Sequence, residues 1–301
     1  MQKLTKKIVD TSEEISDGGK AKRLYKGRKY QRKAYKSVVR GHSRNAGTNF
    51  ANIGTKELCE KYEIKGLEFG VKLSHKERLD YLLATYASMG RIARILKTEN
   101  LGNNVLGIAY AARGSRGAMA HFEPDMLMIN LTRKNGDSCL AHEYGHFLDF
   151  IFGKYIDRNS LASYLSGGRS LAPVANYRGC GLFRTMTNDI LNDISQMECY
   201  KKWSRSHVGK YLCRRTEIFA RVFEQYISWK LRTQRDVFLT KGYFESYTKN
   251  SWYLNESEFK KILPRFNNLI RLMGLYLSGK GSIIPISTDV KIAAEKIKKI
   301  K

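Results

Sequence analysis

Two histidines four positions apart, with a glutamate between them, form the stretch His142-Glu143-Tyr144-Gly145-His146. In an α-helix both rings project from one face, one turn apart, so a nitrogen of each ring can reach the same ion. The glutamate then lies beside that ion without filling its coordination sphere, which suits a general base that takes a proton from water. The pattern H-E-x-x-H is typical of zinc peptidases.

The residues around the motif predict that it lies inside a helix. Asn135-Gly136 predicts a tight turn, Asp137 or Ser138 an N-cap, and Gly153 the end of the helix. A buried histidine pair needs a partner, and a metal ion is one; the alternative is two hydrogen-bonded core histidines. Burial is expected because the helix has a largely apolar surface, formed by Leu140, Tyr144, Phe147, Leu148 and Ile151.

A tight zinc site needs a third protein ligand, and Glu217 is the best candidate. Residues 216–231 repeat their apolar positions at helical spacing and place Glu217, Arg221 and Glu224 on another face, beside the small residue Ala220. We expect Ala220 to let this helix approach the first one closely. The alternative is that Glu217 only pairs with Arg221 on a helix surface.

Asp149 follows on the same face as the two histidines, too far along the axis to bind the same ion. We expect it to accept a proton from a ligand ring, the alternative being a solvated aspartate near the helix end. Arg221 is a candidate for orienting Glu217 or Glu143, or for closing a core ion pair. Peptide hydrolysis also needs a donor for the oxyanion, and the candidates are His121, His207 and Tyr211.

Several stretches of the chain resemble large polyvalent protein-associated domain 1, a zincin-like metallopeptidase domain of the polyvalent proteins of phages and conjugative elements. They are GIAYAARG (107–114), AMAHFEP (118–124), INLT (129–132), AHEYGHFLD (141–149) and EIFARVFEQY (217–226). The resemblance extends from about Gly66 to about Met273. It implies that His142, His146 and Glu217 bind Zn²⁺ and that Glu143 is the catalytic base. Arg215 stands where the family tends to have a proline.

Periodicity and turn residues predict an α+β fold. A capping box at Ser74 and Glu77 begins a long helix that reaches about Lys97, and residues 105–112 and 126–131 are expected to be strands. Helices are expected at 186–197, 257–275 and 289–300, with a loop at 165–181. The order of elements resembles the zincin fold, mostly helical with a small sheet beside the H-E-x-x-H helix. We expect a basic N-terminal arm (1–56), a zincin-like domain (57–278) and a basic C-terminal tail (279–301).

The chain is strongly basic, with a formal net charge of +26 and no acidic residue between Gly18 and Lys56. Eleven lysines and arginines lie between residues 20 and 44, interleaved with tyrosines, a composition suited to phosphates and stacked bases. The alternative is a solvated basic arm without a ligand. The candidates for DNA or RNA contact are Lys22, Arg23, Lys26, Arg28, Lys29, Arg32 and Lys33.

The sequence thus predicts a zinc metallopeptidase, encoded by a phage or mobile element, that cleaves a protein or peptide of the host or the element. The alternative is a basic nucleic-acid-associated protein of a mobile element with a structural or degenerate zincin core. Five widely spaced cysteines predict reduced thiols in a cytosol. The resemblance implies that this is the host cytoplasm, with the protein delivered together with phage or element DNA. No apolar run reaches bilayer length and the first residues lack a secretory h-region, so we expect no membrane contact.

Overall fold

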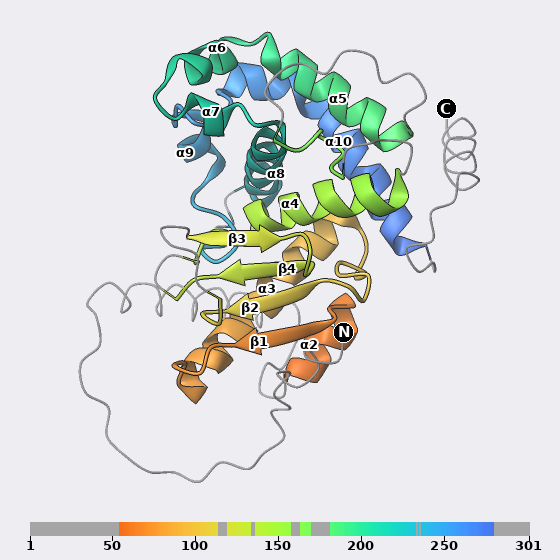
Figure 1. Ribbon diagram of the computed structural model, residues 1–301, viewed down its shortest axis with the longest axis vertical. Helices are drawn as coiled ribbons and strands as arrows, with labels where there is room; N and C mark the ends of the chain where they lie inside the picture. Colours follow the sequence, from red (N-terminus) through yellow and green to blue (C-terminus); the bar gives the residue numbers. More distant parts are fainter. Residues whose placement is uncertain are drawn as a thin grey trace. The chain divides into compact units, whose positions relative to one another are not determined.

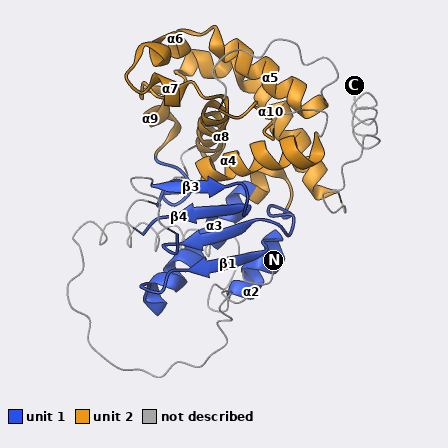
Figure 2. Cartoon of the chain, in the orientation of Figure 1, with its two compact units in different colours: residues 1–92, 99–140, 236–241 blue, residues 93–98, 141–235, 242–301 orange. Residues whose placement is uncertain are grey.

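The computed structural model describes residues 54–113, 119–133, 136–157, 163–169, 181–232, 234 and 236–279. The chain divides into two compact units (Figure 2). Unit 1 comprises Met1–Ile92, Glu99–Leu140 and Asp236–Lys241, and unit 2 comprises Ala93–Thr98, Ala141–Arg235 and Gly242–Lys301. The expected basic arm, apart from its last residues, the helix at 289–300 and most of the loop at 165–181 lie outside the described residues.

Unit 1 contains a four-stranded sheet with the order β1-β2-β4-β3 (Figure 1). The strands are β1 (Gly66–Phe69), β2 (Gly107–Tyr110), β3 (Ala120–Glu123) and β4 (Met128–Leu131). β1, β2 and β4 are parallel, and β3 pairs antiparallel with β4. The strands expected at 105–112 and 126–131 correspond to β2 and β4. β1 and β3 were not expected, and β4 is an inner strand while β3 is at the edge.

Helix α2 (Thr55–Tyr62) precedes the sheet, and α3 (His75–Leu96) follows β1. The expected long helix is therefore confirmed, and so is its capping box, because Ser74 N donates to Glu77 Oε2 at 3.0 Å and Glu77 N donates to Ser74 Oγ at 3.3 Å. In the core of this unit the hydroxyl groups of Thr85 and Tyr110 are 2.7 Å apart. Asp236 joins residues 236–241 to α3 through an ion pair of 3.1 Å with Arg91.

Unit 2 is helical. It contains α4 (Leu140–Ile151, whose first residue is in unit 1), the π-helical turn η3 (Phe152–Ile156), α5 (Leu182–Ser195), α6 (Glu198–Arg205), α7 (Gly209–Leu212), α8 (Arg215–Leu231), α9 (Phe244–Thr248) and α10 (Glu256–Ser278). The helices expected at 186–197 and 257–275 correspond to α5 and α10, and the helix expected at 216–231 to α8. The expected combination of many helices with a small sheet is confirmed.

The α-helix that carries H-E-x-x-H ends at Ile151, two residues before the end predicted at Gly153, but the chain does not leave the helical path there. The chain continues from α4 directly into the π-helical turn, and Gly153 lies inside that turn. Glycine is needed there for a different reason: a Cβ atom at this position would lie only 2.4 Å from the main-chain nitrogen of Leu165. Gly153 therefore permits a close approach of the backbone at 164–165. Within the described part of the chain, no helix is both long enough and apolar enough to cross a bilayer.

Candidate metal centre

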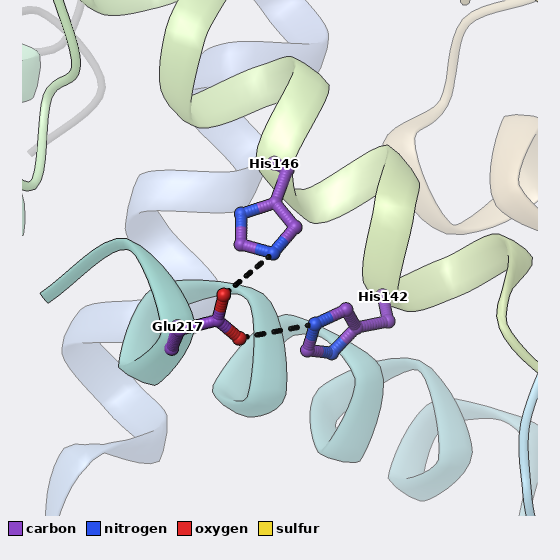
Figure 3. Close-up of side chains that lie close together, drawn as sticks. All are labelled: His142, His146 and Glu217. Carbon is purple, nitrogen blue, oxygen red and sulfur yellow. Dashed lines mark ion pairs between the residues drawn. The ribbon is translucent and has the colours of Figure 1, made fainter. Parts of the chain in front are cut away.

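The two histidines of the motif share one face of α4, as the spacing predicts. Their ring centroids are 4.9 Å apart, and both rings direct Nε2 toward the carboxylate of Glu217 on α8 (Figure 3). Nε2 of His142 is 3.5 Å from Oε2 of Glu217, and Nε2 of His146 is 3.7 Å from Oε1. The structure thus brings together the three residues that the sequence singled out as metal ligands.

Close packing of α4 against α8 places these side chains together. A Cβ atom on Gly145 would lie 3.0 Å from Cα of Ala220 and 3.3 Å from Cβ of Phe223. The expectation that Ala220 allows a close helix approach is therefore confirmed. Gly145 is its counterpart on α4, since a side chain larger than a methyl group at this position would separate the two helices.

The loop at 163–169 fixes the start of α8 relative to α4. Ser166 donates from N and from Oγ to the carboxylate of Asp149, at 2.8 and 2.6 Å. Its carbonyl accepts a hydrogen bond from the guanidinium of Arg215, the first residue of α8. The next residue, Thr216, donates its main-chain N–H to the carbonyl of Gly168 at 2.9 Å, which satisfies a donor that the helix itself leaves unpaired. Arg215 is thus an anchor for the helix that carries Glu217.

Each ligand histidine also has a partner at its other ring nitrogen. Nδ1 of His146 lies 3.1 Å from the hydroxyl of Thr216, and Nδ1 of His142 lies 3.4 Å from Oε2 of Glu224. Such partners orient a ring so that the opposite nitrogen faces a metal ion. Nε2 of both histidines is therefore directed toward the carboxylate of Glu217.

Asp149 does not contact a ligand ring directly, in contrast to the expectation. It is completely buried, and its carboxylate forms hydrogen bonds with Ser166 and with the hydroxyl of Thr216. Because Thr216 also contacts His146, Asp149 reaches the ring only through this hydroxyl. Burial raises the pKa of Asp149 to about 6, although the hydrogen bonds from Ser166 oppose the shift.

The three ligand candidates have strongly shifted pKa values. Burial alone would lower the pKa of His142, but Glu217 and Glu224 raise it to about 9. Burial lowers the pKa of His146 to about 4, against the attraction of Glu217. For Glu217, burial acts to raise the pKa, but His142 and His146 outweigh it and lower the pKa to about 2. Proton and metal therefore compete mainly at His142.

The donor set fits a zinc ion. One ligand atom from each of His142, His146 and Glu217 lies within 4.8 Å of the others, and ligands at tetrahedral angles around Zn²⁺ are about 3.3 Å apart for the usual bond lengths. Oε2 of Glu217 is buried and has no hydrogen bond within the described structure, a condition that a nearby cation relieves. Glu143, the expected base, is also buried, with 6% of its surface exposed. Two histidines and a glutamate are the ligand set of one class of catalytic zinc sites.

The remaining candidates differ in how close they lie to these ligands. Tyr211 of α7 interacts with Glu217. Arg221 donates to the main-chain carbonyls of Glu217, Leu212 and Trp252, not to a carboxylate, so it joins α7, α8 and the segment before α10. Among the described residues Arg221 closes no ion pair, and its hydrogen bond with Glu217 is to the main-chain carbonyl.

His121 lies on β3 in unit 1, where its Nε2 is 3.1 Å from Oε1 of Glu123. Its imidazole thus has a carboxylate partner on its own strand. His207 is exposed, in the turn between α6 and α7. The candidates for nucleic-acid contact, between Lys22 and Lys33, lie outside the described residues.

Comparison with known protein families finds a match in the region that contains Glu217. Residues 204–277 match large polyvalent protein-associated domain 1. The family expected from the sequence is thereby confirmed for this region, which contains α7, α8, α9 and nearly all of α10. The residues that match this family include Glu217 but not the H-E-x-x-H motif. Among curated proteins no match was found, and among solved structures none was found either.

The sequence interpretation placed Glu224 on the polar face of the second helix, but it assigned no support of the ligand rings to Glu224, Thr216, Tyr247 or Tyr253. The roles of Thr216 and Glu224 could have been inferred from their spacing from Glu217. Thr216 precedes the third ligand, and Glu224 follows it by seven residues, two helical turns along the same face of α8. The two tyrosines hydrogen-bond to Glu224 from a separate part of the chain, which no local pattern indicates.

Proposed function

We propose that this protein is a zinc-dependent metallopeptidase of the class that combines H-E-x-x-H with a distant glutamate. The observation that carries the proposal is the convergence of His142, His146 and Glu217 from two helices, with Glu143 next to the first ligand. Structural zinc sites usually have four protein ligands, and in such a site Glu143 would have no role. A three-residue set with an adjacent carboxylate favours catalysis.

A zinc ion held by the three residues would polarise a peptide carbonyl and increase the acidity of a water molecule. Glu143 would take the proton from the attacking water and deliver it to the leaving amine. Partial desolvation and the neighbouring Glu217 raise the pKa of Tyr211, although 41% of this residue is exposed, so its hydroxyl keeps its proton at neutral pH. Tyr211 is therefore our candidate donor to the oxyanion.

The decisive experiment compares the zinc-loaded wild type with Glu143→Gln, using a peptide library as substrate. We expect hydrolysis by the wild type and a loss of about 10²–10⁴-fold in the variant, with the zinc content unchanged. Peptide cleavage by Glu143→Gln at the wild-type rate, or no cleavage by the zinc-loaded wild type, would contradict the proposal.

The family match supports a biological setting for this activity. Large polyvalent protein-associated domain 1 is found in proteins of phages and conjugative elements, so we propose that the protein is encoded by such an element. Its substrate would be a protein of the host or of the element, cleaved in the host cytoplasm. This part of the proposal depends on the resemblance, whereas the hydrolytic chemistry depends on the site.

The charge of the chain favours a second function, contact with nucleic acid through the basic N-terminal residues. Residues 1–50 contribute 14 basic and 4 acidic side chains, and thus +10 of the formal charge of +26. We propose that this segment binds DNA or RNA phosphates. DNA binding should weaken steeply with salt concentration and decrease on removal of residues 1–50, while peptide hydrolysis is retained. Binding that is unaffected by the deletion would contradict this assignment.

A further inference from the structure

Glu224 is a completely buried carboxylate on α8, two turns after Glu217. An ionised group in such a position is costly unless polar partners surround it. Oε1 of Glu224 accepts a hydrogen bond of 2.7 Å from the hydroxyl of Tyr247, and Oε2 accepts one of 2.8 Å from Tyr253. Both oxygens are therefore fixed in place by side chains from outside α8.

The two tyrosines also support each other. Tyr247 belongs to α9 and Tyr253 to the segment before α10, and their ring centroids are 4.7 Å apart in an edge-on arrangement. Both are buried, with 3% and 5% of their surface exposed. Glu224 is thus held by a packed aromatic pair.

The fixed carboxylate faces the ring of His142. Its Oε2 lies 3.4 Å from Nδ1, while Nε2 of the same ring faces Glu217. The distance exceeds that of an ideal hydrogen bond, so Glu224 acts on the ring through a long, charge-assisted contact. A negative charge on this side stabilises a proton on Nδ1 and leaves the lone pair of Nε2 for the metal ion.

We propose that Glu224 is a positioning residue that sets the tautomer and the orientation of His142 for metal binding, and that Tyr247 and Tyr253 hold Glu224 in place for this task. The inference rests on the proposed zinc site but not on peptide cleavage. It makes residues 247 and 253, which are not ligands, determinants of metal affinity.

The test is the dissociation constant for Zn²⁺, measured by competition with a chelator for the full-length protein and its variants. We expect Glu224→Gln to weaken zinc binding by about 10–100-fold. Tyr247→Phe and Tyr253→Phe should each weaken it by a smaller factor. Tyr226→Phe is the matched control, because Tyr226 lies on α8 like Glu224 and its hydroxyl donates a 2.8 Å hydrogen bond to Asn267 of α10 instead of to Glu224. This control should leave the dissociation constant unchanged.

A second measurement separates positioning from general stability. In the zinc-loaded wild type, the Nδ1 proton of His142 should be visible by NMR and exchange slowly with solvent, and in Glu224→Gln this exchange should accelerate. Wild-type zinc affinity in Glu224→Gln would overturn the inference. If that variant does not fold, equal zinc affinities of Tyr247→Phe, Tyr253→Phe and the control would overturn it. If the zinc affinities follow the prediction but the wild type cleaves no peptide, the inference about Glu224 holds and only the peptidase proposal is contradicted. If the wild type binds no zinc, both proposals are contradicted.

Discussion

Nε2 of His142 lies 3.5 Å from Oε2 of Glu217, although the two residues belong to different helices. This proximity depends on the packing of α4 against α8, in which Gly145 of the motif faces Ala220. Position 145, the second variable position of H-E-x-x-H, is thus restricted to a small residue in this protein. The geometry of the ligands and the stability of unit 2 depend on the same contact.

Enlarging residue 145 beyond alanine should therefore impair both properties. Gly145→Ala is expected to be nearly neutral, because the gain in helix propensity offsets the tight contact with Ala220. Gly145→Val should destabilise the protein by about 1–3 kcal/mol through overpacking and weaken zinc binding. Urea denaturation and chelator competition measure the two effects. A valine variant as stable and as tight-binding as the alanine variant would contradict this account.

Zinc binding should depend on pH. Glu217 and Glu224 raise the pKa of His142 to about 9 against the effect of burial, so in the metal-free protein this ring is protonated at pH 7. A ligand histidine must be neutral, and the metal therefore has to displace one proton. The apparent zinc affinity should increase about tenfold per pH unit between about pH 5 and pH 9, and level off above pH 9.

Calorimetry in buffers of different ionisation enthalpy measures the displaced proton directly. At pH 7 we expect a release of about one proton per zinc ion, all of it from His142. The ring of His146, whose pKa burial lowers to about 4, is already neutral and should contribute none. A release close to zero, together with an affinity independent of pH, would show that His142 is not protonated before zinc binds.

The hydroxyl of Thr216 should contribute to metal affinity through His146. Its Oγ1 lies 3.1 Å from Nδ1 of that ring and also interacts with Asp149. Thr216→Val keeps the shape but removes this contact, and we expect zinc binding to weaken by about 10-fold. Thr85→Val is a suitable control, since it removes a buried hydroxyl contact with Tyr110 in unit 1. Equal zinc affinities in the two variants would mean that Thr216 does not support the ring.

The ligands could be predicted from the sequence because their arrangement follows from helical spacing. His142 and His146 are one turn apart, and the apolar positions of residues 216–231 indicated a second helix with Glu217 on its polar side. Ala220 even indicated the close packing. These inferences need only the period of the helix, which local sequence determines well.

The supporting residues could not be predicted, since they depend on contacts between distant segments. Glu224 acquires its role only because Tyr247 and Tyr253 approach it from beyond the end of α8. Asp149 was expected to contact a ring, but the loop residue Ser166 and the hydroxyl of Thr216 take up its hydrogen bonds. The strands β1 and β3 were missed because they are mostly half-buried and lack a continuous apolar run, unlike the largely buried strands β2 and β4.

The most direct test of the central claim is metal analysis of the purified protein and of Glu217→Ala, with Glu198→Ala on the exposed part of α6 as a control. We predict stoichiometric zinc in the wild type and in the control, and a loss of zinc from Glu217→Ala under the same dialysis conditions. Stoichiometric zinc retained by a folded Glu217→Ala variant would contradict the assignment of Glu217 as the third ligand, and with it the proposed metal centre.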